Sequence, residues 1–375
     1  MEMSDDMPLS THIDDNIALF KKTLHADESF DLISRPVQIN RRRCCLFFID
    51  GLIKDEVMEK VLEFFYSLDK EEDMRDANTF VKNCVPYVEV TVTDNSQQIC
   101  MNILSGVSAL FIDGFDQAIM IDSRTYPQRQ TSEPEKDKSL RGSKDGFVET
   151  LISNTALLRR RIRDTNLRIN AFVVGRESKT DVAVCYMDDK VDKQLLAKIT
   201  KQIEAINVHS LTMNQQSLIE AIYKHKWYNP FPKIKYTERP DTAASSLLEG
   251  NIVILVDNSP SVLILPTSIF DIIEEADDYY FPPLTGTYIR FARYIVTLAT
   301  LVITPLWLLA LKNPDLVPKA FSFILITEPV NIPVFWQLML LELGIDGLRL
   351  ASVNTPNSLS TSLSIIGAIA LSDFA

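Results

Sequence analysis

The pattern of hydrophobic and polar positions divides the chain into a long mixed region and an apolar C-terminal region. Within residues 41–123, short apolar runs such as CCLFFID at 44–50 alternate with segments whose apolar residues recur every three or four positions, such as DEVMEKVLEFFYSL at 55–68. The first pattern is typical of a buried strand and the second of an amphipathic helix. Further segments of these two kinds are a predicted helix at 96–104 and predicted strands at 108–113 and 117–122. The alternation predicts a small α/β subdomain at 41–123.

Polar segments border this subdomain on both sides. Residues 1–40 are predicted to be a helical lead-in, because Ile17, Phe20 and Leu24 have helical spacing. Residues 124–146 combine charge, proline and serine without any periodicity, which indicates a linker.

The alternation of strands and helices restarts after the linker. Residues 147–286 are therefore predicted to form a second α/β subdomain together with a connector to the apolar region. Its predicted elements are helices at 147–162, 191–206, 215–223 and 241–248, and strands at 167–175, 180–186, 251–256 and 261–265. The polar part of the chain should thus contain two small α/β subdomains.

The apolar region, residues 287–375, is predicted to be an α-helical transmembrane region. Residues 294–311 (YIVTLATLVITPLWLLAL) contain no charge and are long enough to cross a hydrocarbon core of roughly 30 Å. A second span is expected at 332–352, and the start of a third at 363. Since the last apolar run ends too early to span, we expect the chain to be truncated relative to a complete membrane region.

The distribution of charge bears on partners and location. The apolar region carries as many basic as acidic residues, so the net charge of −12 lies in residues 1–286. An acidic polar region argues against nucleic acid as a partner. No apolar signal segment opens the chain, and Arg290 and Arg293 precede the first span, so the polar region is expected to face the cytoplasm.

The five cysteines show no CxxC spacing, and no histidine cluster accompanies them. We therefore expect neither a disulfide framework nor a zinc site, and we predict no cofactor. The adjacent Cys44 and Cys45 are interpreted as two small core residues.

A repeated FIDG sequence, at 48–51 and 111–114, raises the question of catalysis. In one interpretation Asp50, Asp113 and Asp122 meet at strand ends and hold a metal ion. In the other, each aspartate simply begins a turn after its strand. No glycine-rich phosphate loop or nucleophile elbow accompanies these residues, and the chain is not expected to be an enzyme.

Three threonines of the first predicted span, Thr297, Thr300 and Thr304, fall on one helical face and precede Pro305. One interpretation is a polar stripe against a pore or a partner helix. The alternative is that each hydroxyl bonds to a carbonyl of its own helix.

Three charged residues of the second predicted span, Glu342, Asp346 and Arg349, also share one face. Each charge costs about 2.5–3.5 kcal/mol at a membrane centre unless a partner or water offsets it. A polar pathway or a pair between subunits would provide that offset. Alternatively, Asp346 and Arg349 pair near the cytoplasmic end and reach the interface. Glu342 lies deepest and is the stronger functional candidate.

A long motif in the middle of the chain resembles a known family. YNPFP at 228–232, followed by YTERPDTAASSLLEGNIVILVDNSPSVLILP at 236–266, is similar to the signature of the GerA family of spore germination proteins, of the A-subunit type. The stretches at 269–290 and 345–364 are similar to a sporulation branch of that family, which has no established nutrient ligand. The resemblance covers nearly the whole chain.

This resemblance implies a two-subdomain region that faces the spore core, followed by several helices in the inner spore membrane. It also implies a homo-oligomer that works with other germination membrane subunits and conducts ions, monovalent cations among them. Residues 236–266 would be the connector that transmits movement between the two regions. The charged candidates for this coupling are Glu238, Arg239, Asp241, Glu249 and Asp257.

Two functional hypotheses remain at this point. In the first, the chain is a subunit of an ion channel that promotes or amplifies ion release during germination. In the second, it is a non-conducting scaffold or regulatory subunit of a germinant-receptor or dipicolinic acid release complex.

Overall fold

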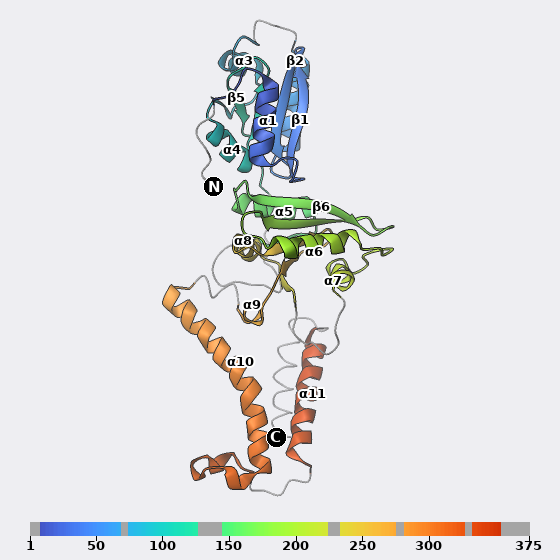
Figure 1. The fold of residues 1–375 in the computed structure, drawn as a ribbon, viewed down its shortest axis with the longest axis vertical. Helices are drawn as coiled ribbons and strands as arrows, with labels where there is room; N and C mark the ends of the chain where they lie inside the picture. The colour runs from blue at the N-terminus through green and yellow to red at the C-terminus, as the bar shows by residue number, and fades with distance from the viewer. Residues whose placement is uncertain are drawn as a thin grey trace. The chain divides into compact units, whose positions relative to one another are not determined.

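A computed structural model describes residues 8–68, 74–126, 145–223, 233–274, 281–326 and 332–353. The chain divides into two compact units, Met1–Gly286 and Thr287–Ala375, called unit 1 and unit 2 below (Figure 1). Most of the predicted linker at 124–146 and the predicted third span from 363 lie outside the described residues.

Unit 1 contains two five-stranded sheets whose neighbouring strands are all antiparallel (Figure 1). Sheet 1 has the order β1-β2-β4-β5-β3, and its strands are, in that order, Leu32–Ile39, Arg42–Ile49, Ser108–Ile112, Ala118–Ile121 and Val90–Thr93. Sheet 2 has the order β6-β7-β9-β10-β8, with Leu167–Val174, Thr180–Met187, Ile252–Val256, Val262–Leu265 and Lys235–Thr237.

Helices pack on both faces of each sheet. Sheet 1 packs against α1 and α4 on one face and α2 and α3 on the other; these helices are Ile13–Leu24, Ser96–Leu104, Asp55–Tyr66 and Ala77–Cys84. Sheet 2 packs against α5 and α8 on one face and α6 and α7 on the other, namely Leu151–Arg161, Pro240–Leu248, Lys193–Glu204 and Gln215–Ile222. Both faces of the inner strands are therefore buried, which explains why β2 is an unbroken apolar run after its two arginines, from Cys44 to Ile49. Cys45 and Phe47 face one core, and Cys44 and Leu46 face the other.

The two halves of unit 1 repeat one topology, helix–strand–strand–helix–helix–strand–helix–strand–strand. We call residues 8–126 repeat 1 and residues 145–265 repeat 2. The same local interactions recur at matching positions. The Ile13 backbone N–H donates to Asp113 Oδ1 (3.1 Å) in repeat 1, and the Leu151 N–H donates to Asp257 Oδ1 (3.1 Å) in repeat 2.

A buried asparagine supports this assignment of equivalent positions. Asn16 of α1 accepts from the Ser10 N–H (2.9 Å) and donates to the Ser10 carbonyl (2.6 Å). Asn154 of α5 makes the same two bonds with the backbone of Val148, at 2.8 and 2.5 Å. In both repeats one amide side chain thus closes the turn that leads into the first helix.

The interpretation of residues 1–40 as a helical lead-in is wrong in its second half. The helix predicted from Ile17, Phe20 and Leu24 exists as α1, but Leu32–Ile39 forms β1 and pairs with β2 over its full length. β1 is an edge strand and contains Pro36, so its apolar positions are fewer and less regular than in β2. The strand signal was weak for that reason.

Unit 2 begins within α10 (Pro283–Lys312) and also contains two short 3₁₀ segments (Pro314–Leu316 and Lys319–Ile324) and α11 (Val334–Val353). Along the chain, the short helix α9 (Ile269–Ile273) follows β10 and precedes α10. Among the described helices, α10 alone is long and apolar enough to cross a membrane, by length and composition. α11 has 20 residues and includes Glu342, Asp346 and Arg349.

Candidate functional site

The three aspartates proposed as a metal cluster do not meet. Strands β2 and β4 are antiparallel, with Cys44 opposite Ile112, so Asp113 follows β4 at the edge of sheet 1 where β2 begins. Asp50 follows the other end of β2 and therefore lies at the opposite edge. In the described parts of the chain, no group of three His, Cys, Asp or Glu residues is placed to hold a metal ion. The metal-cluster interpretation is wrong.

Each of these aspartates has a structural contact instead. Asp113 accepts the first N–H of α1, and Asp122 forms an ion pair with Arg124. The glycines that follow Asp50 and Asp113 have φ of +77° and +91°, which L-residues other than glycine adopt at a cost. The turn interpretation of the two FIDG sequences is therefore confirmed.

The interpretation of Cys44 and Cys45 as core residues is confirmed, and the other cysteines are buried as well. All five are free thiols in the interior of unit 1. Burial raises the pKa of Cys44 to about 12 and that of Cys45 to about 11, which makes both thiols poor nucleophiles.

The predicted connector at 236–266 is an integral part of repeat 2. It supplies strands β8, β9 and β10 and helix α8. Arg239, which is 2% exposed, precedes α8 and pairs with Asp241 through two nitrogens, at 3.1 and 2.6 Å. The Glu238 carbonyl accepts from the Phe147 N–H (2.8 Å), whereas Glu249 is an exposed residue at the end of α8.

Asp257 joins the end of this segment to the start of repeat 2. Its carboxylate accepts from the Leu151 N–H, and the next residue's N–H donates to the Glu149 carbonyl (2.8 Å). The candidate coupling residues therefore differ in their contacts and in their exposure to solvent. Asp257 binds α5, Arg239 and Asp241 bind each other beside α8, and Glu249 faces solvent. A role of these residues in transmitting movement stays a prediction.

Replacing Asp257 by alanine is expected to lower the free energy of unfolding by about 1–2 kcal/mol, because α5 loses the acceptor for its first N–H. Urea unfolding of the full chain in detergent, followed by circular dichroism, measures this change. Glu249→Ala is the control and should change the value by less than about 0.5 kcal/mol. Equal effects of the two substitutions would contradict the assignment.

The two repeats meet at a buried ion pair. Asp31, just before β1, and Arg159, in the last turn of α5, are each 1% exposed. Arg159 donates from Nε and Nη2 to the two carboxylate oxygens of Asp31, at 2.9 and 3.0 Å, and from Nη1 to the Leu167 carbonyl at 3.1 Å. All the charge of this pair is thus compensated inside the protein.

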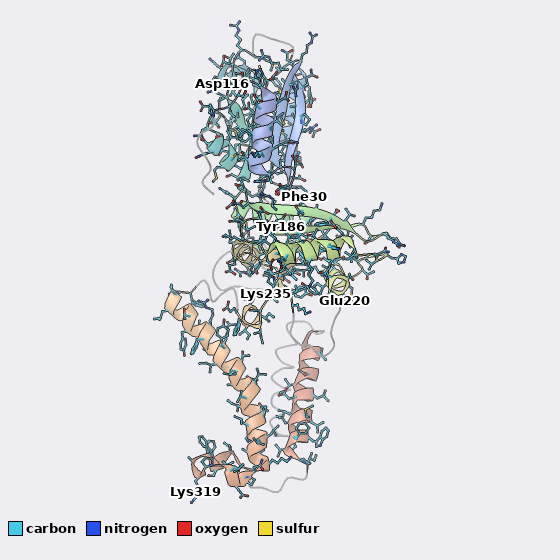
Figure 2. The ribbon with its side chains drawn as sticks, in the orientation of Figure 1. Phe30, Asp116, Tyr186, Glu220, Lys235 and Lys319 are labelled. Carbon is cyan, nitrogen blue, oxygen red and sulfur yellow. The ribbon has the colours of Figure 1, made fainter. Side chains whose placement is uncertain are left out.

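Backbone contacts extend this junction. The Phe30 N–H donates to the Ile169 carbonyl (3.1 Å), and the Ile169 N–H donates to Ser29 Oγ (3.2 Å). Beside them lies a cavity of about 510 Å³, lined by Phe30 and Tyr186 among others (Figure 2). Burial raises the pKa of Tyr186, whose hydroxyl accepts from Asn170 Nδ2 (3.3 Å). The junction holds the start of β1 against β6.

In α10 one of the three threonines has the contact expected of a structural residue. Thr300 Oγ1 donates to the Val296 carbonyl of its own helix (2.8 Å), while Thr297 and Thr304 are half-buried. For Thr300 the back-bonding interpretation therefore describes the structure.

In α11 the acidic side chains are exposed within the single chain. Glu342 and Asp346 are four residues apart and so lie on one helical face. Within the described ranges, no basic side chain forms an ion pair with either. The side chain of Arg349, the third candidate on this face, lies outside the described residues.

Comparison with known proteins decides the family. The model of the family described as "Bacillus/Clostridium GerA spore germination protein" matches residues 18–375. The chain belongs to the GerA family. This confirms the family expected from the motif at 228–266, and membership supports a role in spore germination.

The GerA-family chain is similar to two proteins of Bacillus subtilis (strain 168). It is 37% identical to stage V sporulation protein AF over 361 residues, which cover 96% of this chain and 73% of that protein. It is 29% identical to the uncharacterized membrane protein YfkQ over 378 residues, which cover 99% and 72%. The first likeness agrees with the sporulation branch indicated by the stretches at 269–290 and 345–364.

A solved structure matches the region that unit 1 occupies. The N-terminal domain of the A subunit of the Bacillus megaterium spore germinant receptor GerK3 has a TM-score of 0.54 and 26% identity, and the match covers 71% of this chain and 98% of that domain. The two antiparallel sheets with their helices therefore resemble a germinant-receptor A-subunit domain.

Two features of this GerA-family protein could not be found from sequence patterns. Arg159 and Asp31 are 128 positions apart, and nothing nearby marks either as a buried charge. The repeat was visible only as a restart of strand and helix patterns, since its halves share few identical residues beyond Asn16/Asn154 and Asp113/Asp257.

Proposed function

We propose that this GerA-family protein is a membrane subunit of a spore germination complex that forms, as a homo-oligomer, an ion channel of the inner spore membrane. Unit 1 would face the spore core, and the channel would promote or amplify the release of ions, monovalent cations included. Other germination membrane subunits would be its partners. The observation that carries this proposal is the exposed acidic face of α11, with Glu342 and Asp346.

A carboxylate at the centre of a membrane costs about 2.5–3.5 kcal/mol on insertion scales, and such residues therefore face a bundle interior, a partner or water. In a single chain, no described basic side chain forms an ion pair with Glu342 or Asp346. A water-filled path bounded by several copies of α11 would hydrate both carboxylates and attract cations.

The half-buried Thr297 and Thr304 of α10 are compatible with a place beside the same path. Their hydroxyls can donate to and accept from water without adding charge. We assign Thr297 and Thr304 to the wall of the path and not to ion selection, whereas the Thr300 hydroxyl bonds to its own helix.

The second hypothesis, a scaffold, gives the same carboxylates a different role. There Glu342 and Asp346 would bind basic groups of a partner subunit, and loss of one carboxylate would weaken assembly. Recovery of the complex and ion flux therefore distinguish the two hypotheses.

Replacing Glu342 by glutamine is expected to slow ion release from germinating spores by roughly tenfold, because a cation would lose about 1.4 kcal/mol or more of stabilisation along its path. Cation release into the medium measures the effect, alongside the amount of protein in the membrane fraction. Asp315→Asn, in the 3₁₀ segment after α10, is the control and should release ions at the parental rate.

Co-purification completes this experiment. The channel hypothesis predicts that Glu342→Gln leaves the recovered oligomer and its partners unchanged. Normal ion release together with reduced recovery of partners would support the scaffold instead. Parental values for both readouts would remove Glu342 from either role.

A further inference from the structure

A groove on repeat 1 combines an apolar floor with an acidic wall. It measures about 610 Å³ and lies between α2 and the strands β1 and β2. Leu46, Phe48, Met58 and Leu62 are among the apolar residues that line it. The charged residues of its lining are Arg35, Asp50, Asp55, Glu59 and Glu63.

Three of the carboxylates form a row along α2. Asp55, Glu59 and Glu63 are each four positions apart, so they project from one helical face over about 12 Å. Asp50 lies at the end of β2, and its pKa is raised by burial and by the nearby charges of Asp55 and Asp31. In the part of the chain that the structure describes, no lysine, arginine or histidine forms an ion pair with these four carboxylates.

Repeat 2 carries an ion pair at the place equivalent to Asp50 and Asp55. α2 and α6 have equal length, and each begins five residues after an aspartate, Asp50 or Asp188. In repeat 2 the first helical residue is Lys193, whose ammonium forms an ion pair with Asp188. In repeat 1 the first helical residue is Asp55, so two carboxylates face each other where repeat 2 has a carboxylate and a lysine.

The charge difference continues along the helix. The positions of repeat 2 that match Glu59 and Glu63 are Ala197 and Lys201. The two helices therefore hold equivalent places in their repeats but differ in charge at these positions. Repeat 1 therefore has no lysine at the first helical position, where repeat 2 carries Lys193.

We propose that this groove binds a basic amphipathic segment of a partner protein. Its lysines or arginines would pair with Asp55, Glu59 and Glu63, and the foremost of them would take the position beside Asp50 that Lys193 takes beside Asp188. Its apolar side chains would cover the half-buried Ile33 and the exposed Tyr66 of the lining. This surface belongs to unit 1, so the proposal is independent of whether α10 and α11 conduct ions.

The length of the carboxylate row favours a helical peptide segment over a small amine as the ligand of the groove. A row of carboxylates over about 12 Å matches two turns of a helix, and the apolar floor runs beside the same turns. A small amine would pair with one or two of the carboxylates and leave the rest unpaired. Charge complementarity over the whole row requires at least three cationic groups in a line.

A peptide of matched design tests the proposal on the full chain in nanodiscs of phosphatidylcholine. The probe is a fluorescent, alanine-based helical peptide with lysines at i, i+4 and i+8 and leucines beside them. Fluorescence anisotropy measures its affinity at low and physiological salt. We expect binding that weakens with salt, and an affinity at least about fivefold lower for Glu59→Lys.

Glu56→Lys is the matched control, because Glu56 is an exposed acid of α2 that does not line the groove. It alters net charge equally and should leave the affinity within about twofold. Asp55→Lys is a second variant that recreates the residue of repeat 2. It should abolish peptide binding and raise the melting temperature, since the new lysine can pair with Asp50.

Three results would each overturn the proposal. The first is equal affinity for a peptide whose lysines are spread around the helix. The second is an equal loss of affinity in Glu56→Lys and Glu59→Lys. The third is binding of free lysine amide as tight as that of the peptide, which would mean that the groove takes a small amine.

Discussion

Replacing Arg159 by methionine is expected to lower the free energy of unfolding of unit 1 by about 3–5 kcal/mol, because it leaves the buried carboxylate of Asp31 without its counter-ion. The same substitution leaves the Leu167 carbonyl without the donor at 3.1 Å. Cysteine labelling in increasing urea measures the change, since all five thiols are buried in unit 1 and react only after it opens.

Two controls separate the pair from general damage to α5. Arg160→Met changes the neighbouring arginine, which is exposed and stacks on Tyr126 at 4.4 Å, and should cost less than about 1 kcal/mol. Asp31→Leu combined with Arg159→Met should be more stable than Arg159→Met alone, because no unpaired charge stays buried. A double variant less stable than either single one would show that the pair is not the source of the effect.

Replacing Gly51 by alanine is expected to lower the free energy of unfolding by about 2–4 kcal/mol. Gly51 has φ of +77°, and a Cβ there would lie 2.8 Å from Ile152 Cγ2 and 3.1 Å from the Ile152 carbonyl oxygen. Ile152 belongs to α5 of repeat 2, so the new methyl group would push the two repeats apart. The same thiol-labelling assay measures the loss, with Cys45 and Cys185 reporting on repeats 1 and 2.

Gly114→Ala is the matched control for this prediction. Gly114 also follows an aspartate and has φ of +91°, but a Cβ there would meet only the flexible end of Arg42, at 3.3 Å. Gly114→Ala should therefore lower the free energy of unfolding by about 1–2 kcal/mol, which is the cost of the left-handed backbone conformation for an alanine. If both glycine variants lose the same stability, the close approach of α5 to Gly51 contributes nothing.

Local patterns were sufficient for most of the elements in unit 1. The apolar run at 44–50 and the three-and-four spacing at 55–68 correspond to β2 and α2, and the helix predicted at 96–104 has the bounds of α4. Such patterns succeed because the positions that face a core recur along the sequence with the period of the helix or strand that carries them. They fail at β1, because this edge strand contains Pro36 and its apolar residues do not alternate regularly with polar ones.

Local sequence patterns were not sufficient to predict which candidate site residues lie close together in space. Whether Asp50, Asp113 and Asp122 meet depends on the direction in which β2, β4 and β5 run, and antiparallel pairing sends Asp113 to the far edge of the sheet. The connector at 236–266 has a distinctive sequence, yet its residues are folded into sheet 2 and the cap of α5. The order of strands along the chain does not determine which strands become neighbours in a sheet.

The sequence by itself determined the membership in the GerA family, the division into an acidic mixed region and an apolar one, and the position of most helices and strands. These properties depend on composition and on periodicities of a few residues, which are local. Only the tertiary structure decided that unit 1 is a repeat, that Arg159 and Asp31 join its halves, and that α2 and α6, which differ in charge, hold equivalent places in the two repeats. Each of these depends on contacts between residues far apart in sequence, and the free energy that selects them arises only when both partners are buried together.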